Sequence, residues 1–283
     1  MIVVTCARGK TGSAIASHLA KAGHRVRALV GHENSLADIA ELGVAEAMDC
    51  DLYDAHAVEA ALEGAEQLYY IAPNMNPAER SFGDNVISGA RAARLRKVVF
   101  HSMLHTQIED LPHHWERHYV EGDIISSGLR YVILQCGSYM QNMLPAWPKM
   151  LESGVHTMPY DINQPMSLVD LNDICEVAEK VLTSDDYDYG IYEICGEAIT
   201  LVGKAEILTD VLGSEIRAEK EPLKQFVAHA EALGFSDYTI QTMQRMFPYY
   251  DKHGLAASPR VLEWMLGRPA TDFRTFVERV AAG

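Results

Sequence analysis

The chain has 283 residues, of which 48% are hydrophobic and 22% charged, as in an ordinary globular protein. Its formal net charge of −15 argues against an extended surface for nucleic acid. No segment approaches the roughly 18 continuous apolar residues of a membrane span, and the N-terminal apolar stretch is too short for a signal peptide. We therefore expect a cytoplasmic protein that binds neither nucleic acid nor a membrane. The five cysteines lack metal-ligand spacing, so reduced thiols and no metal are expected.

Short β-branched runs alternate with helical stretches through the first 150 residues, the pattern of a parallel sheet with crossover helices. The predicted strands cover residues 2–5, 25–30, 45–49, 67–71, 97–101 and 130–135. The predicted helices between them cover residues 13–22, 36–42, 58–62, 82–93 and 114–127. Four prolines between positions 145 and 165 mark an irregular region, which a helix at 173–182 and a strand at 190–194 follow.

This order of elements predicts an α/β fold, a Rossmann-type doubly wound parallel sheet with a smaller, mainly helical C-terminal lobe. Residues 1–150 are predicted to form an NAD(P)-binding domain, and residues 166–196 are expected to return to its sheet. Residues 151–283 are then a discontinuous substrate-binding lobe. An apolar helix face is the same in a core and in an interface, so a homo-oligomer is compatible with the sequence.

A glycine-containing turn joins the first predicted strand to the first helix, with the sequence Cys6-Ala7-Arg8-Gly9-Lys10-Thr11-Gly12. Gly9 allows a pyrophosphate close to the backbone, and Gly12 allows close packing of the helix. The helix start offers N–H groups and a positive dipole end to phosphates. The alternative is a structural turn with no ligand.

Cys6 stands where most such turns begin with glycine. Its side chain needs space in a tight turn, which would displace the loop or reduce affinity for the cofactor. Simple tolerance of a small residue and a thiolate activated by the helix start are the two other interpretations.

The second predicted strand ends without an acid at its tip, where Gly31 stands. Arg8 and Lys10 offer positive charge to a ribose 2′-phosphate, which favours NADP. Glu33 is able to reach a 2′-hydroxyl, so NAD stays open. Other cofactor-binding candidates follow the third and fourth strands: Asp51, Leu52 and Ala72. Asp51 is equally well explained as a turn or capping residue.

In the order of its elements and in its motifs, the chain resembles the NmrA-like family of atypical short-chain dehydrogenases/reductases. The likeness rests on CARGKTGS at the first turn, VVFHSMLH at the fifth strand, LPHHWERHYVE and GLRYVILQCGSYMQN. The resemblance implies a Rossmann domain with a substrate lobe and, commonly, NADP(H). Family members include quinone and carbonyl reductases and also non-catalytic, cofactor-sensing regulators.

The resemblance also implies catalytic positions. Ser102 matches the serine that orients a substrate carbonyl, while His113 and Arg117 stand where the related reductases have a Tyr-x-x-x-Lys pair. Histidine is able to deliver a proton near neutral pH, and arginine to bind a ribose or carboxylate. If these residues have no catalytic role, Ser102 is a capping residue, His113 belongs to the start of a helix, and Arg117 forms a surface ion pair with Glu121.

The leading interpretation is an NAD(P)H-dependent oxidoreductase that reduces a small carbonyl, quinone or enone by hydride transfer. A non-catalytic NADP(H)-binding sensor is the first alternative, and a non-redox lyase, isomerase or hydrolase on the same fold is the second. The candidates for binding a small-molecule substrate are His105, Tyr139, Asn142 and Trp147.

Overall fold

The computed structural model describes residues 1–32 and 35–283, which form two compact units. Unit 1 contains residues 1–107, 114–136 and 174–192, and unit 2 contains residues 108–113, 137–173 and 193–283. Glu33, the residue proposed above for a 2′-hydroxyl, lies outside the described residues.

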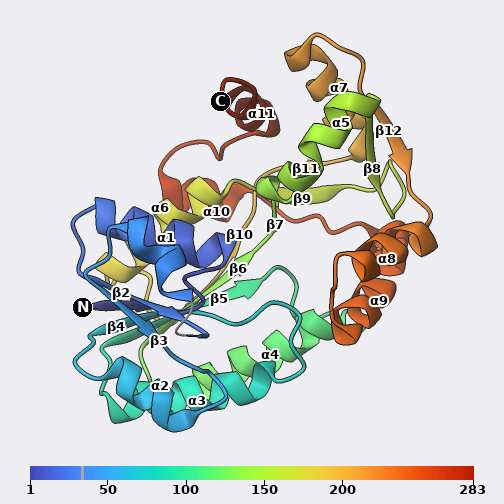
Figure 1. Ribbon diagram of the computed structural model, residues 1–283. Helices are drawn as coiled ribbons and strands as arrows, with labels where there is room; N and C mark the ends of the chain where they lie inside the picture. Colours follow the sequence, from blue (N-terminus) through green and yellow to red (C-terminus); the bar gives the residue numbers. More distant parts are fainter. Residues whose placement is uncertain (33–34) are drawn as a thin grey trace. The chain divides into compact units, whose positions relative to one another are not determined.

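A seven-stranded sheet with the order β10-β6-β5-β4-β1-β2-β3 forms the centre of unit 1 (Figure 1). All the paired strands from β1 to β6 run parallel. From β1 the strand order runs to β2 and β3 on one side and to β4, β5 and β6 on the other. Open α/β sheets bind ligands at such a reversal, at the carboxyl ends of their strands. The strands are β1 (Ile2–Val4), β2 (Val26–Val30), β3 (Glu46–Asp49), β4 (Gln67–Ile71), β5 (Lys97–Met103), β6 (Tyr131–Cys136) and β10 (Gly190–Ile194).

Helices cover both faces of this sheet: α2, α3 and α4 lie on one face, and α1 and α6 on the other (Figure 1). Their bounds are α1 (Lys10–Lys21), α2 (Ala55–Leu62), α3 (Glu79–Ala92), α4 (Pro112–Ser126) and α6 (Leu171–Thr183), with a 3₁₀ helix η2 (Ala37–Leu42) after β2. Central strands are buried on both faces, so their sequences are nearly continuous apolar runs, as in Val98–Phe100.

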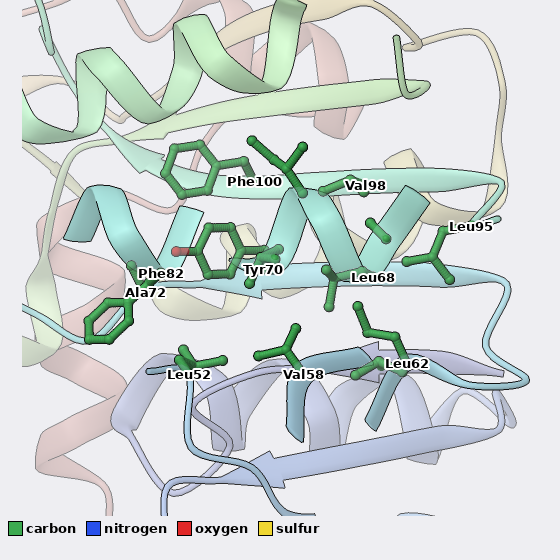
Figure 2. Close-up of a cluster of buried hydrophobic side chains, with 14 of the residues drawn as sticks. Leu52, Val58, Leu62, Leu68, Tyr70, Ala72, Phe82, Leu95, Val98 and Phe100 are labelled. Atoms are coloured by element: carbon green, nitrogen blue, oxygen red, sulfur yellow. The ribbon is translucent and has the colours of Figure 1, made fainter. Parts of the chain in front are cut away.

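The α2–α3 face of the sheet carries an extensive apolar cluster (Figure 2). The ring of Tyr70 stacks on Phe100, with 5.1 Å between ring centroids. Side chains of α2 and α3, such as Val58, Leu62 and Phe82, close over these strands. At roughly 25 cal/mol per Å² of apolar surface, this burial is the main force holding the helices to the sheet.

Unit 2 is built of short strands and helices. A three-stranded sheet has the order β11-β9-β7, and a two-stranded parallel sheet pairs β12 with β8. An apolar cluster joins α7 to α11 through Leu208, Phe276 and Val277. The elements are β7 (Ser138–Tyr139), η3 (Met140–Ala146), α5 (Trp147–Ser153), β8 (Val155–Met158), β9 (Met166–Val169), β11 (Ala198–Ile199), α7 (Leu201–Leu212), β12 (Arg217–Lys220), α8 (Leu223–Ala232), α9 (Asp237–His253), α10 (Arg260–Leu266) and α11 (Phe273–Ala281).

The predicted fold class is confirmed, and the differences lie at element ends. Helix α1 begins at Lys10 and helix α3 at Glu79, earlier than the starts at residues 13 and 82 that the apolar spacing predicted. Residues 137–150, which the sequence analysis placed with the Rossmann domain, group with unit 2, and residues 174–192 return to unit 1. None of the helices in the described residues is long and apolar enough to cross a membrane.

Candidate functional site

The turn between β1 and α1 has the geometry of a phosphate-binding loop. Cys6 adopts a left-handed conformation with φ of 52°, and its carbonyl oxygen accepts a hydrogen bond from the amide of Gly9 at 2.9 Å. A Cβ atom on Gly12 would overlap that same carbonyl oxygen, so only glycine fits. Gly9 precedes the helix without any side-chain cap, and the first turn of α1 contains no acid. The helix start therefore offers backbone N–H groups and a positive dipole end to an anion.

The side chain of Cys6 packs against the apolar cluster of unit 1. It therefore contacts the protein core, which removes the steric objection to a ligand in the turn. Burial raises the pKa of the thiol to about 12, only partly offset by the charge of Arg117. The idea that the helix start activates Cys6 as a thiolate is therefore wrong, and a tolerated small residue fits the structure.

Arg8, the predicted partner of a 2′-phosphate, is exposed and forms an ion pair with Asp38 of η2, with 2.6 Å between Nε and Oδ2. Lys10 and Thr11 begin α1, the first exposed and the second buried. Gly31 is exposed after β2 and has open space around it. Arg8 thus has an acidic neighbour that any 2′-phosphate would have to displace or tolerate.

The remaining cofactor candidates, Asp51, Leu52 and Ala72, make contacts within unit 1. Asp51 accepts a hydrogen bond from the amide of Tyr53 at 3.0 Å, as in a turn. Leu52 and Ala72 are buried in the apolar cluster of unit 1, so their side chains support the loops that follow β3 and β4. The turn role considered for Asp51 has this direct structural support.

Arg117 forms a buried ion pair with Glu79, the first residue of α3. The distance from Nε to Oε1 is 2.7 Å, and the two side chains are 5% and 1% exposed. Arg117 also donates a 2.6 Å hydrogen bond from Nη1 to the carbonyl oxygen of His101 on β5. Burial raises the pKa of Glu79, whereas Arg117 lowers it. The suggested surface ion pair between Arg117 and Glu121 is wrong, because both side chains are buried and Arg117 pairs with Glu79.

Tyr70 lies beside this pair, and its hydroxyl group is buried without a hydrogen-bond partner among the described residues. Burial raises the pKa of Tyr70 well above its usual value, and the charge of Glu79 raises it further, whereas the charge of Arg117 lowers it. A buried hydroxyl with no partner is uncommon, since leaving it unsatisfied costs about 1–3 kcal/mol. The neighbouring His101 contacts the hydroxyl of Tyr69 at 2.8 Å, and burial lowers the pKa of His101 to about 3.

Ser102 is buried at the end of β5, and its hydroxyl donates a 2.5 Å hydrogen bond to Glu121 of α4. The other carboxylate oxygen of Glu121 accepts a 2.9 Å hydrogen bond from the hydroxyl of Thr106. Gln135 of β6 donates to both carboxylate oxygens at 3.0 Å. A buried carboxylate is stabilised by such donors, so Glu121 fixes the orientation of the Ser102 hydroxyl.

His113 is buried in the first turn of α4, and its contacts group it with unit 2, whereas Arg117 one turn later belongs to unit 1. The next residue, His114, is also buried, and burial lowers its pKa to about 4. His105 is half-buried, with a left-handed φ of 57°.

The substrate candidates of unit 2 lie on neighbouring elements. Tyr139 is half-buried on β7, and Asn142 in η3 contacts the hydroxyl of Ser138 at 3.3 Å. Trp147 packs against the apolar cluster of unit 2, which gives it a structural role of its own.

Four residues of these networks were not identified in the sequence: Tyr70, Glu79, Thr106 and Gln135. Tyr70 and Gln135 lie within predicted strands, and nothing in a strand pattern marks a side chain as part of a polar network. Glu79 lies before residue 82, where the apolar spacing predicts the start of the helix that forms α3. An acid in the first turn of a helix was the available signal for it.

The chain is similar to known proteins over its whole length. The chain is 26% identical to "Quinone oxidoreductase 2" of Escherichia coli K12 over 283 residues, which is 99% of this chain and 98% of the relative. It is 25% identical to an "NAD(P)H azoreductase" of Xenophilus azovorans, over 100% of this chain and 98% of that one. The crystal structure of the E. coli quinone oxidoreductase QOR2 complexed with NADPH superposes with a TM-score of 0.84 and 25% identity, covering 99% and 100% of the two chains.

The family comparison covers almost the whole sequence. Residues 1–278 match the NmrA-like family, from the strand before the phosphate loop to the last helix. The chain therefore belongs to the NmrA-like family.

Proposed function

We propose that the protein is an NAD(P)H-dependent reductase that transfers a hydride to a quinone or to a related carbonyl, enone or azo compound. The observation that carries this proposal is the uncapped start of α1 behind the left-handed Cys6, a turn in which only glycine fits at position 12. Full-length similarity to a quinone oxidoreductase and an azoreductase supports the substrate class.

The residues present fit a pyridine dinucleotide. Backbone N–H groups of Lys10, Thr11 and Gly12 would hold the diphosphate, and the loops after β3 and β4, at Asp51, Leu52 and Ala72, would lie along the adenosine half. NADP is favoured because Arg8 and Lys10 supply positive charge, and the related QOR2 was crystallised with NADPH. NAD also fits, since Arg8 is already paired with Asp38. When bound, the reduced nicotinamide supplies the hydride.

The protein would supply orientation and a proton. Ser102 is proposed to orient the substrate oxygen, which requires its hydroxyl to exchange Glu121 for the substrate as its acceptor. His113 is the proposed proton donor, and Arg117 is proposed to bind the ribose or an acidic group of the substrate. His105, Tyr139, Asn142 and Trp147 remain the proposed substrate contacts.

One observation favours a second function, a cofactor-binding sensor without catalysis. The hydroxyl of Ser102 and the charge of Arg117 are both satisfied by buried acids of the protein, Glu121 and Glu79. A donor or a charge that is already paired within the protein stabilises a transition state less. The non-redox alternative loses its support, because the side chain of Cys6 does not block the turn.

The test is a calorimetric titration with NADPH and NADH, followed by anaerobic NADPH oxidation with a panel of quinones, azo dyes, aldehydes and enones. Binding with turnover of a quinone or azo dye supports the reductase. Binding without turnover across the panel supports the sensor, and absence of binding by either nucleotide contradicts both.

A further inference from the structure

A cavity of about 540 Å³ lies in unit 2 between α7 and the segment that leads into β12, and it is open to solvent on one side. Its α7 wall consists of Val202, Ala205, Glu206, Thr209 and Asp210. Residues three and four positions apart share one face of a helix, so this wall is a single stripe along α7. Residues 215–218 form the opposite wall. The volume falls in the range of small-molecule sites, about 300–1,000 Å³.

The two walls of the cavity are fixed to each other by hydrogen bonds. Helix α7 is followed by Gly213, whose left-handed φ of 66° turns the chain back along the helix. The hydroxyl of Thr209 then accepts a hydrogen bond from the amide of Ile216 at 2.9 Å and donates one to its carbonyl oxygen at 3.2 Å. The amide of Arg217 donates at 2.9 Å to the carbonyl oxygen of Gly154, where β12 begins to pair with β8. The cavity is therefore preformed, and a ligand needs to order little of the protein.

The inner surface of the cavity is apolar. Ala205 and Ile216 are each 4% exposed and belong to the apolar cluster of unit 2. Ala218 is half-buried and packs against the same cluster. An apolar group of a ligand would lose its contact with water on this surface, which favours binding.

The outer part of the lining is negatively charged. It carries three carboxylates, Glu206, Asp210 and Glu215, and one cationic side chain, Arg217. Asp210 is paired with Arg274 of α11, with 2.6 Å between Oδ2 and Nη1. Glu206 and Glu215 are exposed and form no ion pair or side-chain hydrogen bond with any residue that the structure describes. The cavity thus combines an apolar surface with two carboxylates whose charge is available to a ligand.

We propose that this cavity binds a small organic cation, a molecule with an apolar body and one protonated amine or guanidine group. The apolar body would cover Ala205, Ile216 and Ala218, and the cationic group would lie beside Glu206 and Glu215. An exposed carboxylate increases the affinity for a cation by up to about fivefold. The site lies within unit 2 and does not depend on the proposed hydride transfer.

The experiment is a ligand-observed NMR titration of the whole protein without nucleotide, at low ionic strength. Three probes of similar size share a phenyl group and differ in charge: 2-phenylethylammonium, 2-phenylethanol and 3-phenylpropanoate. The wild type should bind the ammonium about tenfold more tightly than the alcohol, and the carboxylate more weakly than either. Because exposed charges are screened by salt, the preference for the ammonium should shrink as salt is added.

Substitutions locate the binding site. Glu206→Gln and Glu215→Gln should each weaken binding of the ammonium about threefold, and the double variant about tenfold. Glu231→Gln, which removes an exposed carboxylate of α8 in the same unit, should leave the affinity unchanged. Ala218→Leu fills part of the cavity and should weaken binding of both the ammonium and the alcohol.

Thermal unfolding of each variant verifies that it folds. Equal affinities of the wild type for all three probes, or no binding of 2-phenylethylammonium, would overturn the proposal. An unchanged affinity of the folded double variant for the ammonium would also overturn it, because the cation would then bind elsewhere.

Discussion

The guanidinium of Arg117 and the carboxylate of Glu79 lie 2.7 Å apart (Nε to Oε1) inside unit 1, although one comes from α4 and the other from the start of α3. Both side chains are nearly inaccessible to solvent. Removing one member of such a pair leaves an uncompensated buried charge, whereas removing both does not.

Glu79→Gln is therefore expected to lower the free energy of unfolding by about 3 kcal/mol. The double variant Glu79→Gln/Arg117→Met should recover much of that loss. Urea denaturation measures both values, and Glu59→Gln, on the exposed face of α2, is the matched control. If Glu79→Gln were as stable as this control, Glu79 would not hold Arg117 in place.

The left-handed backbone at Cys6 predicts a strong dependence on side-chain shape. Cys6→Gly should fold and retain nucleotide affinity, because glycine adopts a positive φ without strain. Cys6→Val should destabilise the protein by about 2 kcal/mol, because β-branched residues are strained there. Thermal unfolding and calorimetry provide the two measurements, and equal stability of the two variants would contradict the backbone assignment.

The buried thiol of Cys6 is also expected to have a low chemical reactivity. Because burial raises the pKa of the Cys6 thiol to about 12, that thiol should react slowly with iodoacetamide at pH 8. Mass spectrometry after limited labelling locates the modified cysteines. Rapid labelling of Cys6 would show that the thiol is more exposed or more acidic than described.

The ion pair between Arg8 and Asp38 predicts how cofactor choice responds to mutation. Asp38→Asn frees Arg8 for a 2′-phosphate and should tighten NADPH binding about threefold, with little effect on NADH. Arg8→Ala should weaken NADPH binding about tenfold more than NADH binding. Equal effects of either substitution on the two nucleotides would remove Arg8 from the 2′-phosphate.

Buried neutral histidines predict a loss of stability in acid. Burial lowers the pKa of His101 to about 3 and those of His114 and His156 to about 4. Below pH 6.5 the unfolded chain binds protons that these folded side chains exclude, so each histidine should cost about 1.4 kcal/mol per pH unit until its folded pKa is reached.

Urea denaturation from pH 7 to pH 4.5 measures this slope. His156→Gln should flatten it, whereas His32→Gln, which replaces an exposed histidine, should leave it unchanged. A wild-type stability that is constant across this range would contradict the burial of the neutral histidines.

Much of the fold was predictable from the sequence because its signals are local. Val98, Val99 and Phe100 form a continuous apolar run that only a doubly buried strand explains, and the turn from Cys6 to Gly12 lies between a strand and a helix. The end of β5 was predicted too early, at His101. Ser102 is polar, yet Ser102 and Met103 continue the strand by pairing with Gln135 and Cys136.

The polar networks could not be predicted, because their partners are distant in the sequence. Helical spacing favoured a pair between Arg117 and Glu121, four residues apart. In the folded chain Arg117 binds Glu79, and Glu121 binds Ser102 and Gln135. Which acid a buried base meets depends on how α3 and α4 pack on the sheet, and periodicity carries no information about that choice.

We expect the start of α1 to bind the diphosphate of a pyridine dinucleotide. The most direct measurement is a crystal structure of the protein grown with NADPH. The diphosphate oxygens should lie within hydrogen-bonding distance of the backbone amides of Thr11 and Gly12. An ordered nucleotide bound elsewhere, or an empty turn at saturating NADPH, would contradict it.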